Sequence, residues 1–549
     1  MTKLPFKQQV ADLAKIFKQQ NIRHIVLCPG SRNAPLIQVF ERDESFVCHS
    51  IVDERSAGYV ALGMAKQLRE LTAVVTTSGT AALNLAPAVA EAFNQEIALV
   101  VITADRPEEW PPQFTNQRII QPGIFSQNCK HTCIIPPSSV GPEILNESLQ
   151  KVARFIADAS QAKKGPVHIN ITLEEPLYET ISSPSSSDYK VVEQEEETID
   201  YNEKVVQTIK SALNFRKKVL IIAGMSFYTE EEKVMLDTLI YGYEVSIIAE
   251  NLCNLKNNKL VTAPELVLAR ADKNQKQQIK PDLIITFGGQ VVSKRIRLFV
   301  QDYNDIPIAA FKQFPLALFK QICNEASLEQ ADNAYVKMWK DIEKDAWQKA
   351  TTYLSKAPFS NLTALQRILD LLPQNSILHL GNSGTIRYSQ LRPMRSDLSY
   401  YANRGTSGID GSVSTAAGAA MVSDQLHFLI LGDLSFVYDS NGLWNRNFPK
   451  NLTIIVLNDN GGGIFRLLDG PDRMPFFEAY AVAYHPVSLK HLGEAFGMTC
   501  LKANDYQTLS KAFDELLTLD NQPVLLEIET YESENSSIFK ALFTSLGDS

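Results

Sequence analysis

The sequence has few cysteines and no long apolar run. Its seven cysteines are scattered over 549 residues, an odd and sparse set typical of reduced thiols rather than of a disulfide framework. Cys129 and Cys133 flank His131, but no second ligand pair follows, so we expect no zinc site. No apolar run approaches the roughly 20 residues that span a bilayer. The N-terminal sequence is typical of an amphipathic helix rather than of a signal peptide, so we expect a soluble, cytoplasmic protein.

An excess of positive charge is also missing. The formal net charge is −9, which argues against a general nucleic-acid binder but allows a locally basic pocket. Hydrophobic residues make up 45% of the chain, far more than one core needs, so about three domains are expected.

Short apolar runs alternate with helical patterns through most of the chain, as in βαβ units around parallel sheets. In the first part of the chain, strands are predicted at Ile22–Cys28, Leu71–Thr77 and Ala98–Ala104. In the middle, they are predicted at Val219–Ala223, Glu244–Ala249 and Asp282–Phe287. In the last part, they are predicted at Ser376–Leu380, Leu426–Leu431, Leu452–Leu457 and Val524–Glu529.

Two breaks divide these parts. Residues 182–197 are rich in Ser and Pro and then acidic, which indicates a linker. A second break near 357–360 follows helical sequence at about 333–355. We therefore predict an α/β fold of three doubly wound parallel-sheet domains, with boundaries at 1–183, 198–355 and 358–549. The middle domain lacks a GxGxxG motif, and no P-loop is present, which disfavours a nucleotide-binding regulator.

Two acidic residues follow predicted strands of the last domain. Asp433 ends LHFLILGD, and Asp459 follows LTIIVLN. Ligands in open α/β sheets bind at the carboxyl ends of strands, so these side chains can lie close together. Carboxylate oxygens suit Mg²⁺, and the glycines from Gly461 let a backbone carbonyl approach as a third ligand. Either motif alone is more often an ordinary polar turn; together, at this spacing, they predict a metal–diphosphate site.

This pair resembles the signature of the thiamine-diphosphate enzymes, which begins with GD and ends in a strand followed by NN. Here the end is Asn458-Asp459-Asn460, so a carboxylate stands where the family has a carboxamide, and either Asp459 or Asn460 is the side-chain ligand. The resemblance also implies a glutamate that activates the aminopyrimidine ring. Glu54, in DERSAGYVALGMAK, follows an apolar run and opens a helical pattern, although such an acid often only complements a helix N-terminus.

Further motifs resemble one family within this group, the 2-succinyl-5-enolpyruvyl-6-hydroxy-3-cyclohexene-1-carboxylate synthases of menaquinone biosynthesis. They are CPGSRNAPL, TTSGTAALNLAPAVAEA, TADRP, NQ followed by QPG, GNSGTIR, NRGTSGIDGSVSTAAG and NDNGGGIF, and they span the first and last domains. Members join 2-oxoglutarate to isochorismate, both dianions. Arginine forks match carboxylates, and four arginines stand in loops after predicted strands. These are Arg32, Arg106, Arg387 and Arg404.

The resemblance implies a role for each matching residue. Isochorismate would bind Ser31, Arg32, Arg106, Gln117, Lys294 and Arg295. The part derived from 2-oxoglutarate would bind Ser383, Arg387 and Arg404, beside an apolar wall of Ile464, Phe465 and Leu468. The cofactor would contact Glu54, Gly79, Ile409 as an apolar wedge, Gly432, Asp433, Leu434, Ser435, Asp459, Gly461 and Ile464. Asp433, Asp459 and Gly461 would hold Mg²⁺ or Mn²⁺.

The implied reaction is decarboxylation of 2-oxoglutarate on thiamine diphosphate, followed by addition of the succinyl unit to isochorismate. Family members pair the first domain of one subunit with the last domain of another, so a homodimer or homotetramer with shared active sites is expected. The nearest alternative is another 2-oxoacid decarboxylase or an acetolactate-synthase-like carboligase. The arginines disfavour it, because a pyruvate pocket needs fewer cations.

Overall fold

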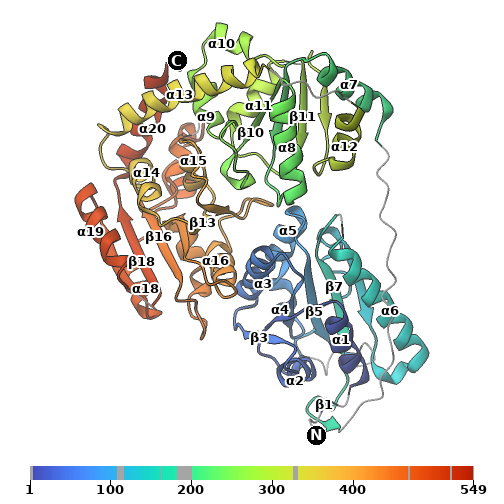
Figure 1. Cartoon of the computed structure of the whole chain (residues 1–549). Helices are drawn as coiled ribbons and strands as arrows, with labels where there is room; N and C mark the ends of the chain where they lie inside the picture. The colour runs from blue at the N-terminus through green and yellow to red at the C-terminus, as the bar shows by residue number, and fades with distance from the viewer. Residues whose placement is uncertain are drawn as a thin grey trace.

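The longer strands form three parallel sheets whose faces are covered by helices (Figure 1). The structure, a computed structural model, describes residues 4–5, 7–107, 116–161, 163–181, 201–303, 305–325, 332–467, 470–519 and 522–547. The linker predicted at 182–197 lies outside these residues. The predicted α/β class with three parallel sheets is confirmed.

The first sheet has the strand order β3-β2-β4-β5-β7-β6. Its strands are β2 (His24–Leu27), β3 (Val47–Ser50), β4 (Thr72–Thr76), β5 (Leu99–Asp105), β6 (His131–Ile135) and β7 (Val167–Thr172). Its helices are α1 (Gln8–Gln19), α2 (Ala34–Arg42), α3 (Glu54–Leu68), α4 (Thr80–Asn84), α5 (Ala86–Asn94) and α6 (Pro142–Ala159). The short strands β1 (Leu4–Pro5) and β8 (Thr180–Ile181) pair antiparallel beside it. We call this body the first domain.

The second sheet has the order β10-β9-β11-β12 and belongs to the central domain. Its strands are β9 (Val219–Ala223), β10 (Val245–Ala249), β11 (Leu283–Phe287) and β12 (Ile308–Ala310). The helices are α7 (Glu203–Asn214), α8 (Glu230–Gly242), α9 (Pro264–Arg270), α10 (Lys273–Gln278), α11 (Lys294–Gln301) and α12 (Leu316–Glu325). A long helix, α13 (Ala334–Leu354), then runs between the central domain and the body that follows (Figure 1).

The third sheet has the order β14-β13-β15-β16-β18-β17. Its strands are β13 (Ile377–Leu380), β14 (Ser399–Tyr401), β15 (His427–Gly432), β16 (Leu452–Asn458), β17 (Thr499–Ala503) and β18 (Val524–Glu529). Its helices are α14 (Asn361–Leu371), α15 (Gly384–Ser389), α16 (Ser412–Ala420), α17 (Asp433–Tyr438), α18 (Leu489–Ala495), α19 (Tyr506–Leu516) and α20 (Glu532–Leu546). Short turns of other helix types follow β16, namely η6 (Gly463–Leu467), η7 (Pro471–Arg473) and the π-helix η8 (Glu478–Val482). We call this body the third domain.

The first and third sheets have the same topology. Replacing each strand from β2 to β7 by its counterpart from β13 to β18 converts one order into the other. In this correspondence α3, after β3, matches α16, after β14, and these two helices pack against each other between the domains (Figure 1). A Cβ on Gly63 of α3 would lie 2.0 Å from the Thr415 carbonyl oxygen, and one on Gly418 of α16 would lie 2.0 Å from the Val60 carbonyl oxygen. Glycine at both positions therefore allows the close approach.

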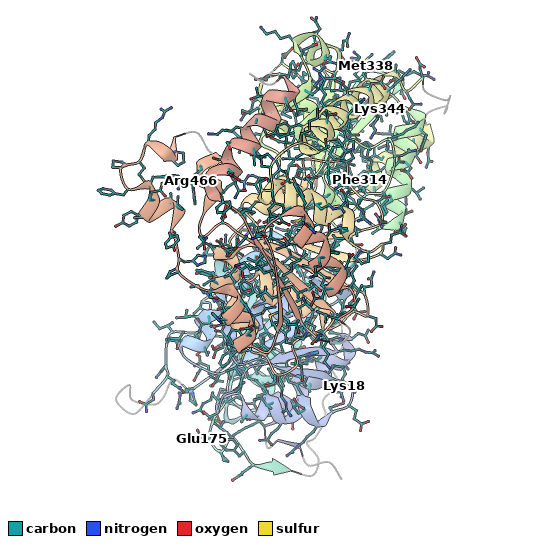
Figure 2. The ribbon with its side chains drawn as sticks, turned by 90° about the vertical axis from the view of Figure 1, so that its left-hand side faces the viewer. Lys18, Glu175, Phe314, Met338, Lys344 and Arg466 are labelled. Carbon is teal, nitrogen blue, oxygen red and sulfur yellow. The ribbon has the colours of Figure 1, made fainter. Side chains whose placement is uncertain are left out.

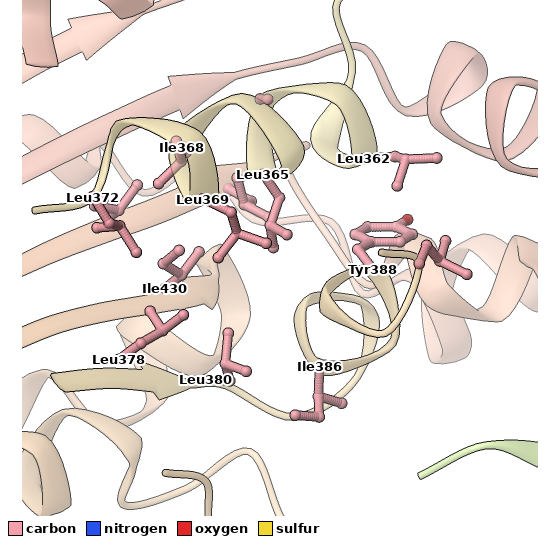
Figure 3. Close-up of a cluster of buried hydrophobic side chains, with 14 of the residues drawn as sticks. Leu362, Leu365, Ile368, Leu369, Leu372, Leu378, Leu380, Ile386, Tyr388 and Ile430 are labelled. Carbon is pink, nitrogen blue, oxygen red and sulfur yellow. The ribbon is translucent and has the colours of Figure 1, made fainter. Parts of the chain in front are cut away.

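Helix α14 anchors the core of the third domain. Its apolar side lies over β13 and β15, where Leu365 and Leu369 face Leu378 and Ile430 (Figure 3). Each such side chain stabilises the fold by about 1.5–3 kcal/mol when fully buried. The helix begins with a capping box at Ser360, and its first residue, Asn361, donates to Oδ2 of Asp459 (3.0 Å) at the carboxyl end of the sheet.

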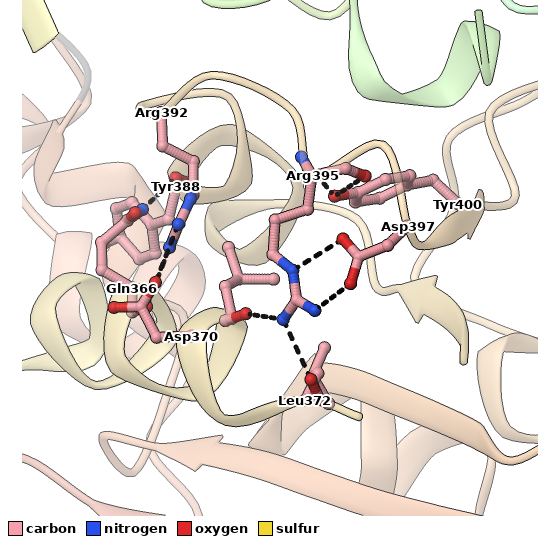
Figure 4. A network of polar contacts seen from close by, with 9 residues as sticks. Gln366, Asp370, Leu372, Tyr388, Arg392, Arg395, Asp397 and Tyr400 are labelled. Carbon is pink, nitrogen blue, oxygen red and sulfur yellow. Dashed lines mark hydrogen bonds and ion pairs between the residues drawn. The ribbon is translucent and has the colours of Figure 1, made fainter. Parts of the chain in front are cut away.

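An arginine binds the C-terminal end of α14. Arg395 donates from Nη1 to the carbonyl oxygens of Leu369 (2.6 Å) and Leu372 (3.0 Å), which lack partners within the helix (Figure 4). Its remaining nitrogens bind both carboxylate oxygens of Asp397, which lowers the pKa of that carboxyl. A second arginine, Arg392, binds Asp370 at 2.8 Å beside it (Figure 4). The helix is thus fixed at both ends.

Candidate active site

Asp433 lies where β15 ends and α17 begins, as predicted. Its Oδ1 accepts the N–H of Leu434 (2.7 Å), and its Oδ2 accepts the N–H of Gly461 (2.8 Å) from the loop after the neighbouring strand. Burial raises the pKa of this carboxyl, while these two hydrogen bonds and a nearby histidine oppose the rise. The side chain is therefore buried and oriented at the carboxyl end of the sheet.

Asp459 follows the adjacent strand, since β15 and β16 pair in parallel up to Gly432 and Leu457. Its Oδ2 accepts hydrogen bonds from the amides of Asn361 (3.0 Å) and Asn535 (3.1 Å). These two asparagines were not predicted, because they come from distant parts of the sequence and belong to no motif. The choice between Asp459 and Asn460 as metal ligand stays a prediction.

His485 is a further residue that the sequence did not reveal. Its Nε2 lies 3.3 Å from Oδ2 of Asp433, and its Nδ1 accepts the N–H of Val487 (3.3 Å). With Nδ1 as the acceptor, Nε2 carries the hydrogen and can donate to Asp433. Because His485 belongs to no motif, the sequence did not predict its contact with Asp433.

The surroundings of Asp433 fit a diphosphate and an apolar wedge. A Cβ on Gly432 would meet no atom within 4 Å, so open space lies beside the start of α17. Ile409 precedes α16 and keeps 37% of its surface exposed, and the Ser435 hydroxyl fixes its carbonyl oxygen at 2.6 Å. Two carboxylates at neighbouring strand ends are suitable oxygen donors for a divalent cation. These features fit the predicted roles of Ile409, Gly432 and Ser435 toward thiamine diphosphate.

A cavity of about 1400 Å³ lies between the central and third domains. Among its lining residues are four predicted cations and one predicted apolar residue, namely Lys294, Arg295, Arg387, Arg404 and Ile464. Burial lowers the pKa of Arg387, and burial together with the charge of Arg387 lowers the pKa of Arg404. The structure therefore concentrates positive charge in one cavity of an acidic protein, a suitable environment for carboxylate groups.

The arginines on the third-domain side are held by groups of their own domain, and Arg387 lies in the short helix α15 rather than in the predicted loop. Arg387 donates from Nη1 to the Ser383 carbonyl oxygen (2.6 Å), and Arg404 donates from Nη1 to Oδ1 of Asn382 (3.1 Å). Ser383 itself has a φ of 73°, a strained conformation for a residue other than glycine. Such strain is typical of functional sites, which agrees with the predicted role of Ser383.

On the central-domain side, two acidic residues organise the turn before Lys294 and Arg295. The buried Glu250 accepts the N–H groups of Val292 (2.6 Å) and Ser293 (2.7 Å), and burial raises its pKa to about 7. Glu265 lies 3.2 Å from Nε of Arg295 and is also a cavity residue. Neither acid belonged to a predicted motif.

A second group of predicted residues lies at the carboxyl end of the first sheet. Arg32 is buried, donates from Nη1 to the Leu173 carbonyl oxygen (2.8 Å), and has its pKa lowered by burial and by Arg106. Gly79 has a φ of 87°, and a Cβ there would lie 2.8 Å from the Gln117 carbonyl oxygen. Arg32 with Arg106, and Gly79 with Gln117, are thus brought together. Ser31 is exposed next to Arg32.

Gln121 is a missed residue of this group. Its Oε1 accepts the N–H of Gly79 (2.8 Å), while its Nε2 donates to Asn170 (3.0 Å) and to the Ala104 carbonyl oxygen (3.1 Å). The fully buried side chain therefore fixes the Gly79 turn. It follows Gln117 in the same stretch, but its partners lie on distant strands.

Glu54 is the first residue of α3 and also lies on the first domain. Its Oε2 accepts a hydrogen bond from Asn84 at 3.4 Å. The adjacent side chains reach the third domain instead: Asn441 donates to Asp53 (2.7 Å), and Arg55 donates to the Tyr438 carbonyl oxygen (2.9 Å). Within the part of the chain that the structure describes, no hydrogen bond joins Glu54 to Asp433.

The loop after β16 completes the third-domain side. Ile464 lines the cavity and Phe465 is 39% exposed beside it, whereas the predicted Leu468 lies outside the described residues. The segment around Arg466 stands out from the third domain (Figure 2). It carries three exposed aromatic side chains, Phe476 (68% exposed), Tyr480 (80%) and Tyr484 (71%). Exposed aromatic side chains therefore follow the loop that carries Asp459 and Gly461.

Comparisons with known proteins match the first and third domains to one class of enzymes. Residues 9–124 match the thiamine pyrophosphate enzyme N-terminal TPP binding domain, and residues 381–528 match the C-terminal TPP binding domain; thiamine pyrophosphate is the same compound as thiamine diphosphate. Three similar proteins carry the name 2-succinyl-5-enolpyruvyl-6-hydroxy-3-cyclohexene-1-carboxylate synthase. They come from Desulfotalea psychrophila (38% identity, 95% of this chain and 98% of the relative), Flavobacterium johnsoniae (35%, 97% and 98%) and Christiangramia forsetii (34%, 99% and 99%).

None of the helices formed by the described residues combines the length and the apolar character needed to cross a bilayer.

Proposed function

Since the chain belongs to the 2-succinyl-5-enolpyruvyl-6-hydroxy-3-cyclohexene-1-carboxylate synthase family of thiamine-diphosphate enzymes, we propose that it decarboxylates 2-oxoglutarate and adds the succinyl unit to isochorismate. The observation that carries this proposal is the cavity lined by Lys294, Arg295, Arg387 and Arg404. Two dianionic substrates need several cations, whereas a pyruvate-type substrate needs fewer.

When bound, thiamine diphosphate supplies the nucleophilic carbon and the electron sink for decarboxylation. Asp433 and either Asp459 or Asn460, with the backbone at Gly461, would hold Mg²⁺ or Mn²⁺ against the diphosphate. Gly432, Leu434 and Ser435 would approach the diphosphate itself, and Ile409 would keep the two rings of the cofactor bent toward each other. Glu54 would hold a proton at the aminopyrimidine nitrogen.

The cations divide between the two substrates. Arg387 and Arg404, with Ser383, would bind the carboxylates of 2-oxoglutarate. Lys294 and Arg295 would bind isochorismate from the central domain, and the first-domain residues Ser31, Arg32, Arg106 and Gln117 would bind it from the other side. Ile464, Phe465 and Leu468 would exclude water from the reacting carbon, which favours carboligation over protonation.

We further propose a homodimer at least, with each active site shared between subunits. Two observations support it: the predicted residues lie on two domains, and the aromatic side chains of Phe476, Tyr480 and Tyr484 are exposed in the segment that follows Asp459. A C₂ dimer would give two equivalent sites.

Subunit mixing tests the shared site. Glu54→Gln and Asp433→Ala homodimers are each expected to be inactive. After subunit exchange, each heterodimer would contain one doubly damaged site and one intact site, so activity would return toward half of the wild-type value per heterodimer. Confirmed exchange without any return of activity would place both residues in one chain's site.

A cytoplasmic location is also part of the proposal. All seven cysteines are free, which suits a reducing compartment.

Release of CO₂ tests the proposed substrates against the acetolactate-synthase-like alternative. With 2-oxoglutarate we expect CO₂ release that rises strongly when isochorismate is added, and little release from pyruvate. Faster release from pyruvate than from 2-oxoglutarate would favour the alternative.

A further inference from the structure

Residues 402–411, which we call the junction loop, connect β14 to α16 and carry both Arg404 and Ile409. All three domains bind this loop. The first domain binds it through Lys66, whose Nζ donates to the Ala402 carbonyl oxygen (2.8 Å). The central domain binds it through Gln290, whose Nε2 donates to the Gly405 carbonyl oxygen (3.0 Å). The third domain binds it through Asn382, whose Nδ2 donates to the carbonyl oxygens of Asn403 and Gly408, both at 2.6 Å.

The strongest of these attachments is made by Glu91 on α5, at the place where the domains meet (Figure 1). Its Oε1 accepts the N–H of Gly405 (2.8 Å), and its Oε2 accepts both the N–H (2.6 Å) and the hydroxyl (2.6 Å) of Thr406. The side chain is 1% exposed. Hydrogen bonds to a buried carboxylate are among the strong ones, so Glu91 fixes the backbone directly after Arg404.

The absence of a side chain at Gly405 allows this contact. A Cβ at Gly405 would lie 2.7 Å from the Glu91 carbonyl oxygen and 3.0 Å from Cβ of Asn94, so only glycine allows the loop to approach α5 this closely. Burial and Arg387 lower the pKa of Arg404, and the charges of Glu250 and Glu91 oppose that shift. The backbone next to the cavity arginine is thus held by an acid that belongs to another domain.

We propose that Glu91 is a positioning residue for the site on its own chain: it holds the junction loop so that Arg404 meets 2-oxoglutarate and Ile409 supports the cofactor. The proposal rests on the proposed function and on the shared site. It implies that each first domain serves two active sites, one through Glu54 and the other through Glu91. Substitutions of Glu54 and Glu91 in the same chain should then impair different active sites of one dimer.

Kinetics of Glu91→Gln test the positioning. The amide can replace only one of the two acceptor oxygens and turns a donor toward the Gly405 or Thr406 N–H, so the loop should shift. We expect the KM for 2-oxoglutarate to rise about tenfold and cofactor affinity to fall, with the KM for isochorismate little changed. Equal changes for both substrates, or none, would overturn the proposal.

Two variants control this experiment. Glu96, just after α5, accepts a hydrogen bond from Gln313 of the central domain (3.1 Å). Glu96→Gln alters this different interdomain contact and should leave the kinetics unchanged. Thr406→Val removes only the hydroxyl that donates to Glu91 and should raise the KM for 2-oxoglutarate by a smaller factor in the same direction. If Glu91→Gln does not fold, the Thr406→Val result decides: an unchanged KM for 2-oxoglutarate would overturn the proposal.

Subunit mixing tests the segregation. A heterodimer of Glu91→Gln with Glu54→Gln should regain one site with the wild-type KM for 2-oxoglutarate, because both lesions fall on the other site. A heterodimer of Glu91→Gln with Asp433→Ala should show only the raised KM. If the first heterodimer shows only the raised KM and the second regains the wild-type KM, Glu91 acts on the same active site as Glu54 of its own chain. Failure of the reference pair, Glu54→Gln with Asp433→Ala, would contradict the shared site instead.

Discussion

At the scale of single residues, several buried acids of this protein act on backbone N–H groups. Asp433 accepts the N–H of Gly461, Glu250 accepts those of Val292 and Ser293, and Glu91 accepts those of the junction loop. A buried carboxylate is costly unless it is hydrogen-bonded, and each of these bonds fixes a loop next to the cavity. The loops around the cavity are therefore held in part by buried acids.

Glu54 gives the first prediction at this scale. Glu54→Gln should fold normally and bind thiamine diphosphate, because Glu54 is only partly buried and accepts just one long hydrogen bond from Asn84. It should slow deuterium exchange at the thiazolium carbon by about 10²–10⁴-fold, the usual contribution of a positioned acid or base. Exchange measured by NMR at the wild-type rate would remove Glu54 from the mechanism.

Asp433 gives the second prediction. Asp433→Ala removes a metal-binding carboxylate and the acceptor for the Leu434 and Gly461 N–H groups. Binding of thiamine diphosphate in the presence of Mg²⁺, measured by calorimetry, should therefore be lost. Wild-type affinity in this variant would show that the metal assignment is wrong.

The sequence revealed the residues that belong to compact motifs and missed those that support them. Glu54, Asp433 and the four arginines stand at strand ends in short patterns that predict chemistry. Asn361, Asn535 and His485 were missed, because each contacts its functional partner across the fold from a stretch without a recognisable pattern. Gln121 stands in the QPG motif, but the motif alone does not reveal its contact with Gly79. Only the packed sheets bring such pairs together.

At the scale of elements, continuous apolar runs predicted strands correctly, whereas runs that mix apolar and polar residues did not. The pattern found β4, β5, β9, β15 and β16, which are buried along most of their length. It missed the edge strands β3 and β17, which are largely accessible. It also missed β7, because His168 and Asn170 interrupt its apolar residues; both bind the Thr103 hydroxyl at 2.8 Å inside the sheet.

The packing of α3 on α16 gives a prediction at this scale. Gly63→Ala would place a Cβ 2.0 Å from the Thr415 carbonyl oxygen, so the helices must separate. We expect a destabilisation of at least about 1–3 kcal/mol, seen as a lower Tm. In the control Gly165→Ala, the nearest atom would lie 3.4 Å away, and the Tm should hardly change. Equal Tm values for the two variants would refute the tight crossing.

Asp439 gives a pH prediction for the start of α16. Its carboxylate accepts the N–H (2.7 Å) and hydroxyl (3.0 Å) of Ser414, and burial raises its pKa to about 7, against about 3.9 in an unfolded chain. The folded state thus favours the protonated acid. The stabilisation this provides is complete below about pH 4 and is lost as the pH rises toward 7.

Asp439→Asn should remove this pH dependence, because asparagine does not ionise and can still accept the Ser414 N–H. The Tm of the variant minus that of wild type should increase from pH 4 to pH 7. The measurement is a thermal denaturation series across this range. A constant difference in Tm would mean that Asp439 does not titrate there.

At the scale of the whole molecule, the first and third domains share one topology although their sequences show no repeat. Strand order depends on backbone hydrogen bonds and layer packing, which many sequences satisfy, so the sequence alone did not reveal the likeness. In this correspondence the residues after β3, which include Glu54, match those after β14, which include Ile409. In the proposed dimer, each of two equivalent sites would take a Glu54 from one chain and an Asp433 from the other.

If the arginine-lined cavity joins decarboxylated 2-oxoglutarate to isochorismate, the mass of the product shows it directly. The measurement is mass spectrometry of the product formed with thiamine diphosphate, Mg²⁺ and both substrates, with a heavy carbon isotope in 2-oxoglutarate at a carbon that decarboxylation retains. We expect one product with the mass of isochorismate plus a labelled succinyl unit, and no such product when isochorismate is omitted. Consumption of labelled 2-oxoglutarate without incorporation into an isochorismate adduct would contradict it.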